Sequence, residues 1–182
     1  IEIDNPTYFS SNGDEISQIP IGFNFEFFGT PYTDCYVGGD GFVTFSNDPY
    51  MYCCGQAIPD IEGPNNLIAL AWTNGDFVST HYELFGTAPN RRLVITLDLG
   101  NPCDSSYYGQ VKLFESTNII EIHTQQWYGG ECQGWNVTQG IENADGTVAY
   151  AVPGRNYNEI WQVLPGDDDF VSFTPEDPFE YL

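Results

Sequence analysis

The side chains best suited to acid–base or metal chemistry are few in this chain. His81 and His123 are its only histidines, and neither stands in the H-x-H or H-E-x-x-H spacing that brings two imidazoles to one metal. The G-x-S-x-G elbow, the P-loop and the Gly-rich dinucleotide fingerprint are absent from the sequence. Two of the 26 acidic residues could always be proposed as a glycosidase pair, but at this density such pairs arise by chance. We therefore expect a protein that is not an enzyme, with a hydrolase as the least favoured alternative.

Clustered carboxylates offer a second kind of chemistry, the binding of calcium through hard oxygen ligands. Asp167, Asp168 and Asp169 are consecutive, and Asp60 and Glu62 lie close together in a polar stretch. No EF-hand spacing is present, and a solvated acidic turn is the simpler explanation of each cluster. The sequence establishes no cofactor, and calcium is the one for which it offers candidate ligands.

The five cysteines are placed for disulfides and not for zinc, because none stands in a paired Cys-x-x-Cys pattern. Cys103 and Cys132 fall in two predicted loops, 100–108 and 125–134, that an up-down-up arrangement of strands brings to one end of a sheet, so we pair them. Cys35 lies near the base of a predicted hairpin, to which the chain returns just before Cys53 and Cys54, and we pair Cys35 with one of these two. Disulfides indicate an oxidising compartment, and the odd number leaves at least one thiol free or intermolecular.

Aromatic residues beside the same two loops are the best candidates for a contact surface. Tyr107, Tyr108, Trp127 and Tyr128 would share the end of the sheet that holds the first cysteine pair. Exposed aromatic rings stack on sugars and are favoured in protein interfaces, although ordinary loop packing would also explain them. Asn136 opens an Asn-Val-Thr glycosylation sequence, which is often unused inside a strand.

The charge balance excludes several classes of partner. Four basic residues stand against 26 acidic ones, which gives a formal net charge of −22, so the chain lacks the clustered Lys and Arg that nucleic-acid binding requires. Anionic membrane surfaces are disfavoured for the same reason. Membrane insertion is not expected, because no run of about 18 apolar residues is present. The chain begins at Ile1 instead of Met, which we interpret as a mature product or an excised domain.

Alternating apolar side chains predict that β-strands position these residues. Over 19–29, Ile and Phe occupy every second position up to residue 27, so one face of a strand carries an apolar row. The run 67–72 is apolar throughout and is typical of a strand buried on both faces. Alternation over 93–99, 110–114 and 120–123 predicts a three-strand antiparallel meander.

The remaining patterns complete an all-β prediction. Residues 30–34 are expected to form a connector and 143–146 a turn. Further strands are expected at 77–85, 135–142, 147–152, 160–164 and 170–174, which gives about a dozen strands and no significant helix. We expect a two-sheet antiparallel β-sandwich of jelly-roll-like type. It would form a single domain over 1–182, with a core at about 17–175. The segments 1–9 and 176–182 would be exchanged with a neighbour or act as links.

Several stretches, taken together, resemble known extracellular modules. The aromatic strand at 19–29 and the hairpin at 37–45 resemble the opening of nidogen-like extracellular domains. Asp40 stands where that hairpin turn usually has Asn, and Thr73 and Asn74 replace a common acidic pair. A cation site formed by those acids in relatives would lack its ligands here. Further stretches resemble β-sandwich modules of large secreted and cell-surface bacterial proteins, often gliding, adhesive or type IX-secreted ones: 53–59, 64–69, 86–91, 113–123 and 139–147.

The resemblance implies a secreted or cell-surface, non-catalytic module and supplies no catalytic residues. Our leading hypothesis is a structural or adhesive module, either one domain of an adhesin or a subunit of an extracellular filament. Its partners would be further copies of itself, other cell-surface proteins or glycans. In the filament form, a terminal segment would add a strand to a neighbour's open sheet. The alternative is a carbohydrate-binding module that uses the aromatic group.

Overall fold

The structure is a computed structural model that describes residues 3–9, 16–47, 55–74, 77–100, 106–128 and 136–175, and of residues 77, 78, 99 and 100 the backbone alone. This described part contains twelve strands and no helix, which confirms the all-β prediction. No helix in it has the length and apolarity to cross a membrane. In chain order the strands are β1 (Thr7–Phe9), β2 (Ile16–Phe27), β3 (Thr30–Gly38), β4 (Phe42–Thr44), β5 (Leu67–Trp72), β6 (Phe77–Phe85), β7 (Arg92–Gly100), β8 (Ser106–Phe114), β9 (Ile120–Tyr128), β10 (Thr138–Glu142), β11 (Ala149–Ala151) and β12 (Asp169–Phe173).

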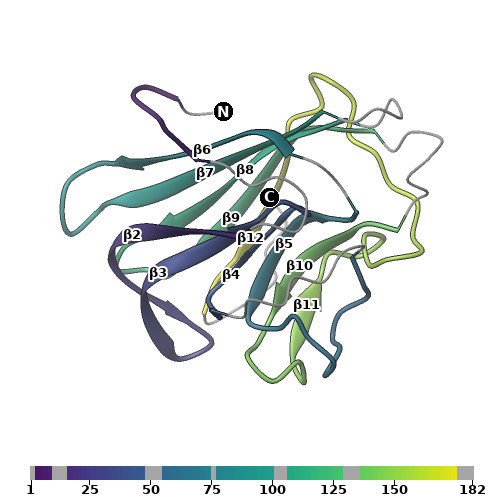
Figure 1. The fold of residues 1–182 in the computed structure, drawn as a ribbon, viewed down its shortest axis with the longest axis horizontal. Helices are drawn as coiled ribbons and strands as arrows, with labels where there is room; N and C mark the ends of the chain where they lie inside the picture. The colour runs from purple at the N-terminus through teal and green to yellow at the C-terminus, as the bar shows by residue number, and fades with distance from the viewer. Residues whose placement is uncertain are drawn as a thin grey trace.

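The strands form two six-stranded antiparallel sheets around one main core, so the predicted sandwich is confirmed (Figure 1). Sheet A has the order β1-β6-β7-β8-β9-β12, and sheet B has the order β11-β10-β5-β4-β3-β2. The predicted meander is the centre of sheet A, where β7, β8 and β9 pair in sequence. At the edge of this sheet, β1 pairs with β6 of its own chain.

Strand β2 supplies the aromatic row that the sequence predicts. Every second side chain from Ile19 to Phe27 is buried in the main core, and the side chains between them are exposed. Its pairing with β3 is irregular between Pro20 and Phe25, and Gly22 in this interval has a φ of +86°, a conformation that glycine adopts without strain. The expected connector at 30–34 is instead part of β3, because the turn between the strands needs only Phe28 and Gly29.

Strand β5 is buried on both faces, as its continuous apolar run predicts. One face joins the main core, and the other joins a second cluster with Phe42 and Ile58. Ile58 belongs to the segment 55–66, which hydrogen bonds hold against sheet B. Thr138 Oγ1 donates to Gln56 O at 2.5 Å, Asn156 Nδ2 donates to Ile58 O at 2.8 Å, and Asp60 N donates to Glu142 Oε1 at 2.7 Å.

Two differences from the expected strands affect the placement of candidate residues. Strands β8 and β9 extend to Ser106 and Tyr128, so the loops predicted at 100–108 and 125–134 are shorter than expected. The strand expected at 160–164 is irregular, and only Val163 forms a bridge there, with Trp127. The alternation in β8 and β9 continues through residues that the sequence predicts to be in loops, and this alternation decides where their aromatic rings point.

Candidate functional site

The outward face of sheet A carries both histidines and several other polar side chains, but its centre is covered: His81, Thr96, Gln110 and Lys112 are each at most 7% exposed. Apolar side chains at alternate positions of its strands point into the core, so the residues between them point outward. Strand registers place six of these outward residues side by side, one on each strand. From β1 to β12 this outer row consists of Tyr8, His81, Thr96, Gln110, His123 and Phe170.

The two histidines of the outer row have different surroundings. The ring of His81 lies 5.1 Å from that of Tyr8, and the ring of His123 lies 4.7 Å from that of Phe170. His123 Nε2 lies 2.8 Å from Glu121 Oε2. His81 is only 6% exposed, and neither of its ring nitrogens has a hydrogen-bond partner in the structure as described. Burial lowers the pKa of His81, and the charges of Glu83 and Asp98 partly oppose this change.

Beside the row, a polar groove of about 440 Å³ opens on sheet A. Gln126 and Tyr108 are register partners on β9 and β8, and Gln126 Nε2 donates to Ser106 Oγ at 2.6 Å. Burial raises the pKa of Asp98, while the charge of His81 lowers it. Burial also raises the pKa of Tyr108. The described residues that line this groove, which we call the sheet A groove, are Asp98, Ser106, Tyr107, Tyr108, Gln125, Gln126 and Pro165.

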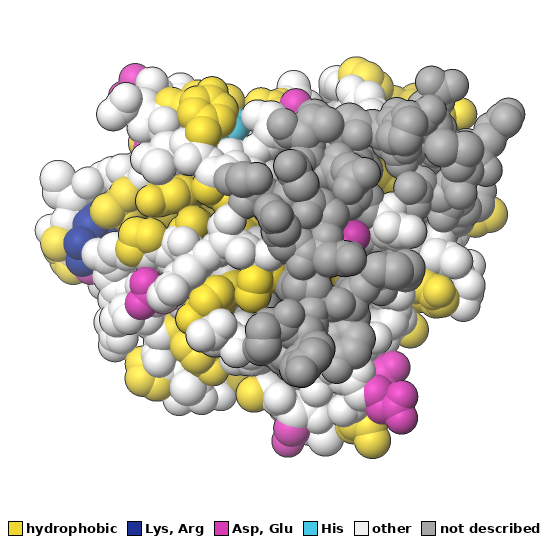
Figure 2. Space-filling model, viewed as in Figure 1, with side chains coloured by type: hydrophobic (Ala, Val, Ile, Leu, Met, Phe, Trp, Pro, Cys, Tyr) yellow, Lys and Arg dark blue, Asp and Glu magenta, His cyan; other side chains and the backbone are white. Residues whose placement is uncertain are grey.

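The outward face of sheet A is close to neutral, although the protein is strongly acidic. Two of the four basic residues of the chain, Arg92 and Lys112, belong to this face by alternation, together with both histidines. Among the described strand residues of this face, Glu83, Asp98 and Glu121 are acidic. In the view of Figure 2, acidic side chains are scattered over the surface, and Lys and Arg side chains are visible at the left edge.

The predicted aromatic group is divided between the two faces of sheet A. Tyr107 and Trp127 are fully buried in the main core, so their prediction as loop residues of a contact surface is wrong. Tyr108 and Tyr128, which follow them in sequence, point outward, and Tyr128 is 46% exposed. The cause is strand alternation, which sends neighbouring residues to opposite faces.

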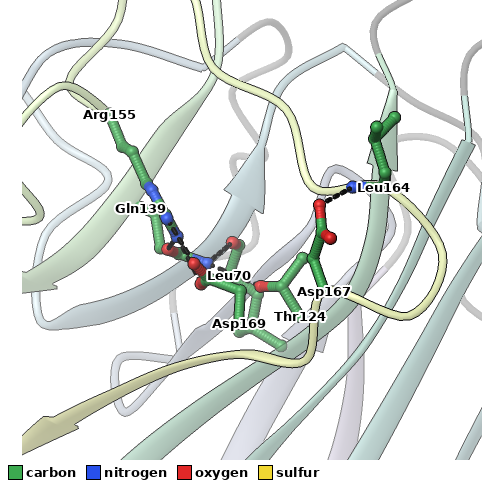
Figure 3. A network of polar contacts seen from close by, with 7 residues as sticks. All are labelled: Leu70, Thr124, Gln139, Arg155, Leu164, Asp167 and Asp169. Atoms are coloured by element: carbon green, nitrogen blue, oxygen red, sulfur yellow. Dashed lines mark hydrogen bonds and ion pairs between the residues drawn. The ribbon is translucent and has the colours of Figure 1, made fainter. Parts of the chain in front are cut away.

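The consecutive aspartates, which the sequence offers as candidate calcium ligands, take different partners in the structure. Asp167 accepts a hydrogen bond from Leu164 N at 3.2 Å, and Asp169 forms a two-bond ion pair with Arg155 at 2.5 and 2.6 Å (Figure 3). Asp168 is exposed. Within the described ranges, no three His, Cys, Asp or Glu side chains are grouped to hold a metal ion.

The Arg155–Asp169 ion pair belongs to a network that connects the two sheets (Figure 3). Arg155 also donates to Gln139 Oε1 at 2.6 Å. Gln139, on β10 of sheet B, donates to Thr124 Oγ1 on β9 of sheet A at 3.0 Å and to Leu70 O at 2.9 Å. Sequence patterns gave no sign of this network, because its members lie far apart in the chain.

The structure describes one of the five cysteines. Cys35 is a free, fully buried thiol on the core side of β3, next to Ile19, and burial raises its pKa. This differs from the predicted disulfide, because the side chain points into the sandwich and not toward the hairpin base. The other four cysteines lie outside the described residues: Cys53, Cys54, Cys103 and Cys132.

The third residue of the predicted glycosylation sequence, Thr138, is buried and hydrogen-bonded. Asn136 is half-buried and precedes β10, and Thr138 is fully buried within that strand. The Thr138 hydroxyl donates to Gln56 O and accepts from Tyr157 N at 3.1 Å. Glycosylation of Asn136 stays an untested prediction.

Sequence reasoning placed His81 in the correct strand but did not predict that its ring would be buried without hydrogen-bond partners in the described structure. Its position in the predicted strand 77–85 was correct. The available signal was the alternation of His81 and Glu83 with Thr80 and Tyr82, which predicts that the imidazole shares a face with Glu83. The neighbourhood of Asp98 could not be derived, because it depends on the register of β6 against β7.

Comparisons with known proteins return one match. A family model described as NIDO related matches residues 2–175, a range that contains all twelve strands. No curated protein and no solved structure matches the chain.

Proposed function

We propose, since the chain belongs to the NIDO-related family, that it is an extracellular, non-catalytic module that acts by contact through its surface. The observation that carries this proposal is the near-neutral outward face of sheet A. A molecule with a net charge of −22 repels other copies of itself and other acidic surfaces. Lys112 and His81 are buried on this face, but Arg92 and His123 are partly exposed, and contact with an acidic partner meets the least repulsion beside them.

The ionic contacts of the described residues support a structural use of charge. Arg91 binds Glu115 with distances of 2.5 and 2.8 Å, and its Nη1 donates to Gly22 O on β2 at 2.7 Å. This contact joins β2 of sheet B to the start of β7, as Arg155 joins β10 to β12. These two arginines are thus engaged in holding the sandwich together.

An adhesive or self-associating role predicts that a charge placed on the outward face of sheet A weakens contact. Tyr8, on β1, is 67% exposed, and Ile61, in the segment that covers sheet B, is 73% exposed. Tyr8→Asp should reduce self-association or adhesion to cell-surface material, and Ile61→Asp should leave both unchanged. Sedimentation and bead-adhesion assays measure the two effects. Equal behaviour of the two variants would count against a role for this face.

The filament form of the proposal involves the short edge strand β1. In the described N-terminal segment, Thr7–Phe9 pairs with β6, and Asp4 N and Asn5 N donate to the Glu83 carboxylate at 2.9 and 2.8 Å. The same edge of β6 could accept this segment from another copy. Removal of residues 1–9 should abolish assembly seen by electron microscopy, and filaments that form without the segment would contradict strand exchange through it.

Carbohydrate binding is the second candidate function. It is favoured by the outward orientation of Tyr108 and Tyr128 beside the sheet A groove, where a sugar ring could stack on an aromatic face. Calorimetric titration with oligosaccharides tests it, and Tyr128→Ala should weaken any binding that is found. The absence of binding across a broad glycan panel would remove this candidate.

A further inference from the structure

We propose that the sheet A groove and the neighbouring His81 form a binding site for neutral saccharides. His81, Asp98 and Gln126 would supply hydrogen bonds, and Tyr108 would supply an aromatic face. This inference rests on the carbohydrate-binding form of the proposed function, and it adds the charge class of the ligand and the residues that select it.

The first argument is the unsatisfied imidazole of His81. Both ring nitrogens are buried and lack hydrogen-bond partners in the described structure, and a buried polar group without a partner destabilises a fold. Because burial lowers its pKa, the ring is neutral at pH 7, with one nitrogen as donor and the other as acceptor. Both nitrogens lack accessible surface, and His81 is not among the described residues that line the groove, so binding requires the ring to turn toward the groove. A sugar hydroxyl, which both donates and accepts, then suits either nitrogen.

The second argument is the charge of the groove. Asp98 is its acidic lining residue, and Glu83 lies close enough to His81 for its charge to affect the pKa of the ring. The outer row beside the groove contains no Lys or Arg, and its His123 already lies against Glu121. The net charge of −22 repels anions at longer range. A carboxylate accepts hydrogen bonds from adjacent hydroxyls. Neutral sugars therefore fit this site, and sialylated or sulfated ones do not.

The third argument is the size and shape of the site. Its volume of about 440 Å³ lies within the range of small-molecule sites. Tyr108 lines it, and Tyr8 and Tyr128 expose large parts of their rings on the same face. Gln126 contributes an amide that already donates to Ser106 Oγ. Polar groups that converge beside aromatic rings are the arrangement that binds sugars with orientation as well as contact.

A glycan array provides the first test. The intact chain should bind oligosaccharides that end in neutral hexoses or N-acetylhexosamines, and it should not bind sialylated or sulfated ones. No binding to neutral glycans, or binding only to acidic ones, would overturn the proposal. Binding of spermine at the groove in place of sugars would also overturn it, because it would assign the acidic residues to a cationic ligand.

The two histidines provide a matched pair of variants for the second test. They lie in the same outer row, but His123 already has Glu121 as a partner, whereas His81 has none in the described structure. With the best neutral glycan of the array, His81→Gln should weaken binding at least about tenfold in Kd. His123→Gln should leave Kd within about twofold of the parent. Equal Kd values for the two variants would overturn the assignment of His81.

Further variants keep the site testable if a substitution at His81 prevents folding. Circular dichroism should first show that each variant folds. If His81→Gln does not fold, Gln126→Ala and Asp98→Asn test the same groove from β9 and β7, and unchanged Kd values in both would overturn the site. If the intact chain fails to bind sugars but still adheres or assembles, this inference fails while the surface-contact function stands.

Discussion

Glu142 is a carboxyl group held inside the fold at the end of β10. It is fully buried, and it accepts a hydrogen bond from Asp60 N at 2.7 Å. Burial raises its pKa from 4.5 to about 7, with a further contribution from the charge of Asp60. A folded-state pKa above the unfolded value means that protonation stabilises the fold. This stabilisation is complete below pH 4.5 and is lost as the pH rises through about 7.

Replacement of Glu142 by Gln should therefore remove a pH dependence. Gln keeps an acceptor for Asp60 N and cannot ionise, so Glu142→Gln should flatten the stability profile between pH 4.5 and 7. At pH 8 the variant should be more stable, by up to about 3 kcal/mol. Urea unfolding at pH 5 and pH 8 measures this, with the exposed Glu62→Gln as control. An unchanged slope between the two pH values in Glu142→Gln would contradict the assignment.

At the residue level, local conformation could be predicted from residue type, whereas burial and long-range partners could not. The turn at 143–146 was evident from its Asn, Asp and Gly residues, and in the structure Gly146 has a φ of +67° and packs against Asp60 O. The burial of Tyr107 was not predicted, because predicting it requires the first residue of β8 to be known within one or two positions. The partner of Asp169 was missed because Arg155 reaches it from a separate loop.

At the element level, strands with strong alternation were located correctly. The predicted limits of β5 and β6 agree with the structure, because an apolar run and a clear period-2 pattern identify strands directly. Weaker alternation led to a wrong strand prediction at 160–164. The segment 160–164 has exposed Ile160 and Leu164 on either side of buried Trp161 and Val163, a pattern of alternating burial that occurs here without a paired strand.

The contact of Arg155 with Asp169 predicts a measurable coupling between elements. Arg155→Met keeps a long side chain over Trp161, where the guanidinium now lies 4.7 Å from the ring centre, but it leaves Asp169 without its cation. We expect a loss of about 2–4 kcal/mol in unfolding free energy. A double-mutant cycle with Asp169→Asn should show that the second substitution costs much less in the Arg155→Met background. Additive losses in urea unfolding would mean that the pair is not coupled.

At the scale of the whole molecule, sequence reasoning predicted the architecture but not the distribution of its surface. Two sheets follow from many short amphipathic strands, because each must bury one face. The near-neutral outward face of sheet A depends on strand order and register, which place Lys112 and both histidines on that face. No local pattern contains this information, so the sheet A groove could not be predicted.

The net charge of −22 predicts how the whole molecule responds to salt. Like charges repel more in the compact state than in the unfolded chain, so screening should favour folding. An increase in NaCl from about 0.01 M to about 0.1 M shortens the screening length from about 30 Å to about 10 Å, and the melting temperature should rise. Asp169 is engaged by Arg155, so CaCl2 at equal ionic strength should act no differently from NaCl through this cluster. A melting temperature that rises at micromolar calcium, where screening is unchanged, would show instead that the protein binds calcium specifically.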